Sequence, residues 1–247
     1  MKAIMLAAGI GKRLYGDASR QHKALLRFAG QSLLERHIKT LRRCAIEHLV
    51  LVVGHRAEQV LAEVSRLRAD EFVSPIHNPD YLRGSLVSLW CARGAFRDPE
   101  GFLYMDADVL YHPALIDRLI ASPHADCLLL DRDFESDEEP VKVCVGRGQV
   151  IEFRKRIQGV DPELVGEWPG FMKISASTAA ELARIMQEFI DSGRIDDPME
   201  EAVRELILRR PERFGWEDVT GLPWIEIDFP ADVDRAREKI LPHIETL

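Results

Sequence analysis

The N-terminal segment joins a short apolar run to a glycine-rich, basic loop. Ile4–Ala8 carries no charge and is typical of a central parallel strand that is covered on both faces. Gly9 and Gly11 follow directly; they allow a sharp turn and leave backbone N–H groups that can bind an anion. The cations around this loop are Lys12, Arg13, Arg20 and Lys23. Together these features predict an α/β fold whose first turn binds phosphate groups.

The glycine pair by itself indicates only a tight turn. The P-loop motif G-x-x-x-x-G-K-[ST] does not occur in the sequence, and the third glycine of a Rossmann fingerprint is missing because Leu14 follows Arg13. The basic residues therefore support the phosphate site more strongly than the glycines do. They are a local exception in a chain whose net charge is −8, and that charge argues against a general nucleic-acid binder.

Length and composition fit one globular domain. With 247 residues, we expect a single domain, whose residues 1–110 form a nucleotide-binding half and whose residues 111–247 form an acceptor-binding half. The four cysteines are far apart and include no C-x-x-C pair, so we expect reduced thiols in a cytoplasmic protein. No apolar run reaches the roughly 18–20 residues of a membrane span, and no signal peptide is expected.

Strands and helices alternate in the first half of the chain, which predicts a mixed, mostly parallel, Rossmann-like sheet flanked by helices. Ser32 and Glu35 have the spacing of a capping box before the first long helix. The second half is less regular and predicts a small β-rich portion. Its expected elements are a hairpin over 141–153, strands over 167–174, 214–219 and 224–227, and helices over 177–190, 199–208 and 232–240.

Carboxylates follow two of the expected strands. Asp106 and Asp108 end the apolar run that starts at Phe102, and Asp228 follows the strand that starts at Trp224. Ligands bind beyond the carboxyl ends of parallel strands, and Mg²⁺ prefers carboxylate and phosphate oxygens. Asp-x-Asp pairs are also common at turns, and Asp228 could instead cap the last helix. Asp232 already fits that N-cap position.

Three segments resemble the nucleotidyltransferases with a GT-A-like fold. They are L-A-A-G-x-G-x-R followed by K-A-L, then G-E-x-x-G-x-x-K-x-S at 166–175, and W-x-E-I-D-x-P-x-D at 224–232. The most similar subgroup is that of the small cytidylyltransferases of the phosphocholine or aminoethylphosphonate type. The chain departs from the family at one position, because His22 stands where Pro usually precedes the lysine.

The resemblance implies a reaction. The enzyme would transfer a nucleoside monophosphate, with CTP favoured as donor, to a small phosphorylated or phosphonate alcohol or amine such as phosphocholine, and release pyrophosphate. Arg13 would bind the β- and γ-phosphates, and Lys23 would bridge the α-phosphate and the acceptor. Asp108 and Asp228 would hold one Mg²⁺, while Asp106 would orient a loop or a water. The nucleotide would also contact Leu6, Ala7, Ala8, Gly9, Gly11, Gly84 and Ser85.

The acceptor is less well defined. The resemblance implies Glu167, Trp168 and Lys173 as acceptor-binding residues, and an amine would also suit Trp90, Tyr111 and the acidic run 131–139. Core packing explains the aromatic residues equally well. We also consider a homodimer, a sugar-1-phosphate nucleotidyltransferase, more distantly a molybdenum-cofactor nucleotidyltransferase, and a nucleotide-binding regulator that has lost turnover.

Overall fold

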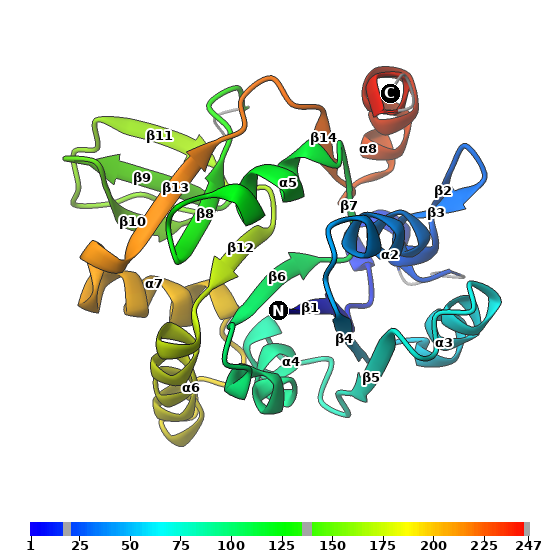
Figure 1. The fold of residues 1–247 in the computed structure, drawn as a ribbon, viewed down its shortest axis with the longest axis horizontal. Helices are drawn as coiled ribbons and strands as arrows, with labels where there is room; N and C mark the ends of the chain where they lie inside the picture. Colours follow the sequence, from blue (N-terminus) through cyan, green and yellow to red (C-terminus); the bar gives the residue numbers. More distant parts are fainter. Residues whose placement is uncertain (17–20, 135–139, 245–247) are drawn as a thin grey trace.

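A seven-stranded sheet forms the centre of the computed structural model, which describes residues 1–16, 21–134 and 140–244 (Figure 1). The strands lie in the order β13 (Phe214–Asp218), β8 (Asp126–Leu130), β12 (Phe171–Ile174), β6 (Phe102–Asp106), β1 (Lys2–Ala7), β4 (His48–Val53) and β5 (Val73–His77). Neighbours run parallel except at β12, which is antiparallel to both β6 and β8. The predicted mixed, mostly parallel sheet is confirmed.

Helices cover both faces of this sheet. One face packs against α2 (Leu33–Arg43), α3 (Ala57–Arg66) and α5 (Ala114–Ala121), and the other packs against α4 (Ser85–Cys91), α6 (Ala176–Asp191) and α7 (Met199–Arg209). Side chains alternate along β1: Ala3 and Met5 join the first core and Ile4 joins the second. Burial on both faces explains why the first strand is an uninterrupted apolar run.

The β-rich portion of the second half is a three-stranded antiparallel sheet. Its order is β10 (Gln149–Arg154), β9 (Lys142–Gly146) and β11 (Leu164–Glu167). The single strand expected over 167–174 is wrong, because β11 ends at Glu167 and β12 begins in the central sheet at Phe171. Gly170 makes the turn between them with φ 86°, where a side chain would meet the Asp106 carboxylate at 2.8 Å.

The C-terminal segment returns to the middle of the chain. β14 (Trp224–Glu226) pairs antiparallel with β7 (Val109–Tyr111), and the N–H of Ile227 donates to the Asp108 carbonyl at 3.0 Å. This pairing brings Asp228 beside the end of β6. The chain then continues through α8 (Pro230–Arg235), the π-helical segment η5 (Ala236–Ile240) and α9 (Leu241–Ile244).

The last helix begins earlier than expected. It starts at Pro230, so Asp232 is its third residue and not its N-cap. The Asp232 carboxylate nevertheless caps the helix from inside, because it accepts from the N–H groups of Asp228 at 2.9 Å and Phe229 at 2.6 Å. The helix-capping alternative for Asp228 therefore fails, since the Asp228 carboxylate makes other contacts.

Short elements complete the described chain: α1 (Lys12–Tyr15), η2 (Lys23–Leu25), β2 (Arg27–Phe28), β3 (Gln31–Ser32), η3 (Arg93–Arg97) and η4 (Pro211–Arg213). β2 and β3 form a small antiparallel hairpin between η2 and α2. Within the described residues, the helices are all too short or too polar to cross a membrane.

Candidate active site

The site lies where the carboxyl ends of β1 and β6 meet. Leu6 pairs with Asp106 in the parallel ladder, so the loop after β1 and the turn after β6 leave the sheet at the same edge. Gly11 ends the first loop in a left-handed conformation with φ 63° and leads into α1, which carries Arg13. Lys23 opens η2, which follows the loop.

Two cations from the start of the chain meet two carboxylates from its middle and end. Lys23 Nζ donates to Asp228 Oδ1 at 2.6 Å and to Asp108 Oδ2 at 3.2 Å. A guanidinium nitrogen of Arg13 lies 2.8 Å from Asp228 Oδ2, and the guanidinium stands 5.6 Å from the centre of the Phe229 ring. The structure thus brings together the four charged residues that the sequence proposed, although their catalytic and metal-binding roles stay predictions.

Lys23 is the most enclosed of the four. Its side chain is 12% exposed, against 43% for Arg13. Burial opposes a charged amine, but the carboxylates of Asp108 and Asp228 outweigh it and raise the pKa of Lys23. Lys23 is therefore a permanent positive charge at the point where the two acidic segments meet.

Glu226 is a third carboxylate that the sequence analysis did not assign. Oxygens of Asp108, Glu226 and Asp228 all lie within 4.8 Å of one another. Surrounding protein and the charges of Asp108 and Asp228 raise the pKa of Glu226, although its side chain is exposed. The signal was present in the sequence, because residues two apart on a strand share a face.

The donor set of this cluster fits Mg²⁺. Three carboxylates supply hard oxygen ligands on one side, and the remaining positions would be open to phosphate oxygens and water. Asp106 is oriented differently: it accepts from the Tyr104 hydroxyl at 2.7 Å and lies against Gly170. Burial and the nearby Asp108 charge raise the pKa of Asp106 well above its usual range. The contact with Gly170 fits the expectation that Asp106 orients a loop.

A small pocket of about 50 Å³ adjoins this cluster. It is lined by five residues predicted to contact the nucleotide, Leu6, Ala7, Gly9, Gly11 and Lys23, and by His22, Ala24, Ala107 and Asp108. Ala8 lies beside it, with its side chain in the core and its carbonyl accepting from the N–H of His55 at 3.1 Å. The pocket has a floor of backbone and small side chains, which suits close approach by a flat or anionic ligand.

Gly84 and Ser85 have structural contacts instead. A side chain at Gly84 would lie 2.0 Å from the Asp197 carbonyl, so the close approach of that segment requires glycine. Ser85 Oγ accepts from the N–H of Met199 at 2.8 Å, at the start of α7. Neither residue lines the small pocket. Their contact with the nucleotide stays a prediction; in this structure Gly84 and Ser85 contact the segment that leads into α7.

A larger cavity of about 410 Å³ opens on the other side of the carboxylates. Among the described residues, six acids and two cations line it: Asp131, Asp133, Glu167, Glu226, Asp228, Asp232, Arg235 and Lys239. Trp224 and Phe229 also line it, and the Trp224 indole N–H donates to Asp131 Oδ2 at 2.7 Å. Glu167, one of the residues predicted to bind the acceptor, therefore lines this cavity, and so does Trp224, which was not predicted.

Trp168 and Lys173 do not face this cavity. Trp168 is 5% exposed, packs against Tyr104 and Phe153, and donates its indole N–H to the Phe171 carbonyl at 2.8 Å. Lys173 pairs with Leu103, the second residue of β6, whereas the carboxylates follow the other end of that strand, about 10 Å along it at Asp106. The geometry opposes both acceptor assignments, since burial makes Trp168 a core residue and register puts Lys173 far down the strand.

The remaining proposed contacts also lie elsewhere. Tyr111 is buried against His37 and Phe171, and the ring of Trp90 carries the Arg93 guanidinium at 4.6 Å. Tyr111 is therefore a core residue, and the Trp90 ring makes a cation–π contact with Arg93. Arg20 and residues 135–139 of the acidic run lie outside the described residues.

Comparison with known proteins gives a consistent family match. Residues 3–186 match the family described as "MobA-like NTP transferase domain". The chain is 30% identical over 249 residues to the "Bifunctional IPC transferase and DIPP synthase" of Rubrobacter xylanophilus, covering 97% of this chain and 52% of that protein. It is 26% identical over 253 residues to the "CMP-5'-(3-aminopropyl)phosphonate synthase" of Streptomyces rubellomurinus, covering 98% of this chain and 39% of the relative. The chain therefore spans about half or less of these two relatives.

A solved structure shares the whole fold. The CTP:phosphocholine cytidylyltransferase of Streptococcus pneumoniae superposes with a TM-score of 0.74 at 21% identity, covering 96% of this chain and 97% of that one. At this identity the likeness supports the fold alone. It confirms the expected GT-A-like nucleotidyltransferase architecture.

Proposed function

The chain belongs to the family of MobA-like NTP transferase domains, and from that premise we propose that it transfers CMP from CTP to a small phosphorylated or phosphonate acceptor. The names of relatives support this choice of donor and acceptor class, since one makes a CMP-phosphonate and another is an IPC transferase. The observation that carries the proposal is the meeting of Lys23 with Asp108 and Asp228 between the two cavities.

The proposed reaction exchanges one phosphorus–oxygen bond for another. An oxygen of the acceptor phosphate or phosphonate attacks the α-phosphorus of CTP, and the bond from that phosphorus to the β-bridging oxygen breaks, so that pyrophosphate leaves. The protein needs to supply no nucleophile; it positions two anions and offsets their repulsion. Mg²⁺, when bound, supplies charge neutralisation at the phosphate oxygens.

Each charged residue has a place in this scheme. Lys23 lies nearest to both carboxylate segments and would stabilise negative charge on the α-phosphate as it develops. Arg13, more exposed on α1, would bind the β- and γ-phosphates. Asp108, Glu226 and Asp228 would hold the metal, and Glu226 is the addition that the geometry makes.

The larger cavity favours an acceptor that carries a positive charge. Apart from the proposed metal ligands Glu226 and Asp228 and the Asp232–Arg235 pair at 2.5 Å, three acids line it against one cation, Lys239. Asp131 is 6% exposed and lies beside the Trp224 ring. An ammonium group would find both an aromatic face and carboxylates there. A phosphorylated or phosphonate amine therefore fits this cavity better than a neutral sugar phosphate does.

A pyrophosphate-release matrix tests the proposal. CTP, UTP, GTP and dTTP are each combined with phosphocholine, phosphoethanolamine, aminoethylphosphonate, inositol phosphate and glucose-1-phosphate, with Mg²⁺ and with EDTA. We expect release with CTP and an amine-bearing acceptor in Mg²⁺. Release with glucose-1-phosphate alone would favour the sugar alternative. Nucleotide binding without release from any pair would indicate the silent regulator.

A further inference from the structure

The segment that carries Lys23 rests on one face of α3. Gln59 and Glu63 are one helical turn apart and so share a face of that helix. The N–H of His22 donates to Gln59 Oε1 at 3.3 Å, just before Lys23. Glu63 accepts from Arg27 and from Ser32 on the hairpin that follows Lys23. The helix thus contacts the segment on both sides of the lysine.

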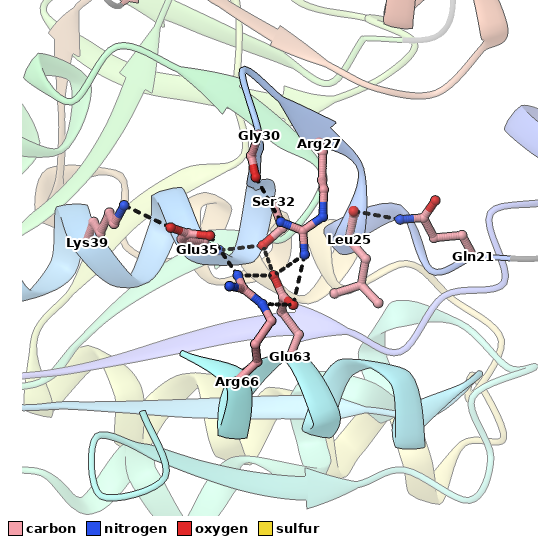
Figure 2. A network of polar contacts seen from close by, with 9 residues as sticks. All are labelled: Gln21, Leu25, Arg27, Gly30, Ser32, Glu35, Lys39, Glu63 and Arg66. Carbon is pink, nitrogen blue, oxygen red and sulfur yellow. Dashed lines mark hydrogen bonds and ion pairs between the residues drawn. The ribbon is translucent and has the colours of Figure 1, made fainter. Parts of the chain in front are cut away.

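Glu63 is the buried centre of an ionic network whose arginines, Arg27 and Arg66, are exposed (Figure 2). Its carboxylate is 7% exposed and accepts from Ser32 Oγ at 2.6 Å, from Arg27 at 3.1 Å and from Arg66 at 2.7 Å. These bonds hold the pKa of Glu63 down at about 2, with the Arg66 bond as the largest cause. The hairpin β2–β3 is therefore bound to α3 by charge-assisted hydrogen bonds, which are stronger than neutral ones.

The same network changes the expected start of α2. Ser32 Oγ caps the helix by accepting from the N–H of Glu35 at 3.0 Å. The Glu35 carboxylate does not return to Ser32 as a capping box requires; it pairs with Lys39 and Arg66, each at 2.8 Å (Figure 2). Ser32 thereby serves both α2 and α3, and the hairpin that follows Lys23 is fixed to two helices.

His22 keeps the backbone conformation that proline would impose. Its φ is −71°, a value that a proline ring would also allow. The proline of the resembled motif would therefore fit the same backbone. Unlike proline it has an N–H, which reaches Gln59, and its Nδ1 accepts from the N–H of Ala24 at 3.1 Å. Two hydrogen bonds therefore take the place of a covalent ring in restraining the turn at Lys23.

We propose that Gln59 and Glu63 are positioning residues for Lys23, and that the Gln59–His22 bond replaces the stiffness of the proline found in the resembled motif. This inference rests on the proposed function, in which Lys23 must meet the α-phosphate closely. Both act on the chain on either side of the lysine: Gln59 through the backbone N–H of His22, and Glu63 through the side chains of Arg27 and Ser32. Displacement of a charged group by about 1 Å can cost roughly 100-fold in rate.

A double-mutant cycle between positions 22 and 59 tests the proposal. Gln59→Ala should lower kcat about tenfold while the KM for CTP changes less than about twofold. The same change in a His22→Pro background should have almost no further effect, because proline has no N–H for Gln59 to accept. Glu58→Ala, on the exposed side of the same helix, is the matched control and should leave kcat unchanged.

The contact of Glu63 with the hairpin is tested by a second pair of variants. Glu63→Gln keeps the size and the acceptor oxygen but removes the charge that Arg27 and Arg66 share, so kcat should fall. Glu35→Gln removes a carboxylate from the same Arg66 without contacting the hairpin strand that carries Arg27, and kcat should stay unchanged. Equal loss in both variants would show general destabilisation and overturn the assignment of Glu63.

Two readouts make the outcome independent of turnover. Amide hydrogen exchange of residues 22–26 and acylation of the Lys23 amine, both followed by mass spectrometry, should become faster in Gln59→Ala and not in Glu58→Ala. Unchanged exchange and labelling, or faster exchange with normal kcat, would overturn the inference. A wild-type protein that releases no pyrophosphate refutes the proposed function, and exchange and labelling then decide the positioning by themselves.

Discussion

Lys23 Nζ donates a hydrogen bond of 2.6 Å to Asp228 Oδ1, and this bond joins side chains that are 205 positions apart in the chain. The same ammonium group reaches Asp108, so three distant segments converge on one charge. Partly buried charges lower the stability of the fold unless each one keeps a partner of opposite charge. A cluster of this kind therefore points to a functional role.

Replacement of Lys23 by Met should lower turnover by about 10²–10³, the usual cost of one group that stabilises charge in the transition state. Thermal unfolding should remain a single cooperative transition, since Lys23 belongs to no apolar core cluster. Pyrophosphate release measures the turnover, and a melting curve measures the unfolding transition. Lys173→Met is the matched control: its ammonium donates to the Ser122 carbonyl at 2.8 Å, far from the carboxylates, and kcat should not change.

The same substitution should strengthen the binding of Mg²⁺ when no nucleotide is present. Lys23 competes with the ion for Asp108 and Asp228. At an effective dielectric of 20, an ammonium group 4 Å from a divalent ion repels it by at most about 8 kcal/mol. After screening by solvent we expect at least about a tenfold gain in affinity for Lys23→Met. Calorimetric titration of Mg²⁺ into the protein measures it.

Wild-type protein should show the reciprocal effect. CTP offers Lys23 and Arg13 new anionic partners and so releases the carboxylates, which means that nucleotide and Mg²⁺ should each increase the affinity for the other by the same factor. A non-transferable CTP analogue allows this measurement without turnover. Equal Mg²⁺ affinity with and without the analogue, or a weaker affinity in Lys23→Met, would contradict this competition.

Glu226 provides a separate prediction. If it is a ligand, Glu226→Gln should weaken Mg²⁺ by at least about tenfold, because even residues that only support a ligand cost 10- to 100-fold. Asp228→Asn should do the same. Glu188→Gln, which breaks a surface pair with Arg209, should leave the titration unchanged. A normal titration for Glu226→Gln combined with a weakened one for Asp228→Asn would restrict the site to the two aspartates.

Local sequence patterns predicted much of the framework. Buried parallel strands appear as continuous apolar runs, so the strand over 4–8 was placed correctly within two residues, and the carboxyl-end rule placed Asp108 beside the glycine loop. Asp228 could be brought to the same edge only by the family resemblance, since nothing local indicates that β14 pairs with β7. Pairings between distant segments depend on tertiary packing.

The assignments that the geometry does not support have the same origin. Trp168 and Lys173 belong to a segment that matches the family motif, but Trp168 is buried in the core and β12 carries Lys173 down the sheet away from the site. Periodicity cannot show where a strand pairs. Gly84 was predicted to contact the nucleotide, and the sequence could not show that the approach of Asp197, more than a hundred residues away, also requires glycine there. Glu63 gave no signal because an acidic residue in an amphipathic helix is usually exposed.

Buried histidines should make stability depend on pH. His37 is fully buried, and desolvation lowers its pKa to about 4 from 6.5. Between these values the unfolded chain binds the proton and the folded chain does not, so this contribution to stability is complete above pH 6.5 and is lost as the pH falls towards 4. A shift of this size corresponds to about 3 kcal/mol.

Other groups also titrate in this range, and raised carboxyl pKa values such as that of Asp106 act in the opposite direction. The contribution of His37 is therefore measured as the difference between wild type and His37→Gln in urea unfolding from pH 4 to 7. That difference should change by about 1.4 kcal/mol per pH unit near pH 5. His77→Gln, an exposed residue of β5, is the control. A difference between wild type and His37→Gln that is constant over the whole range would mean that His37 does not remain neutral in the folded protein.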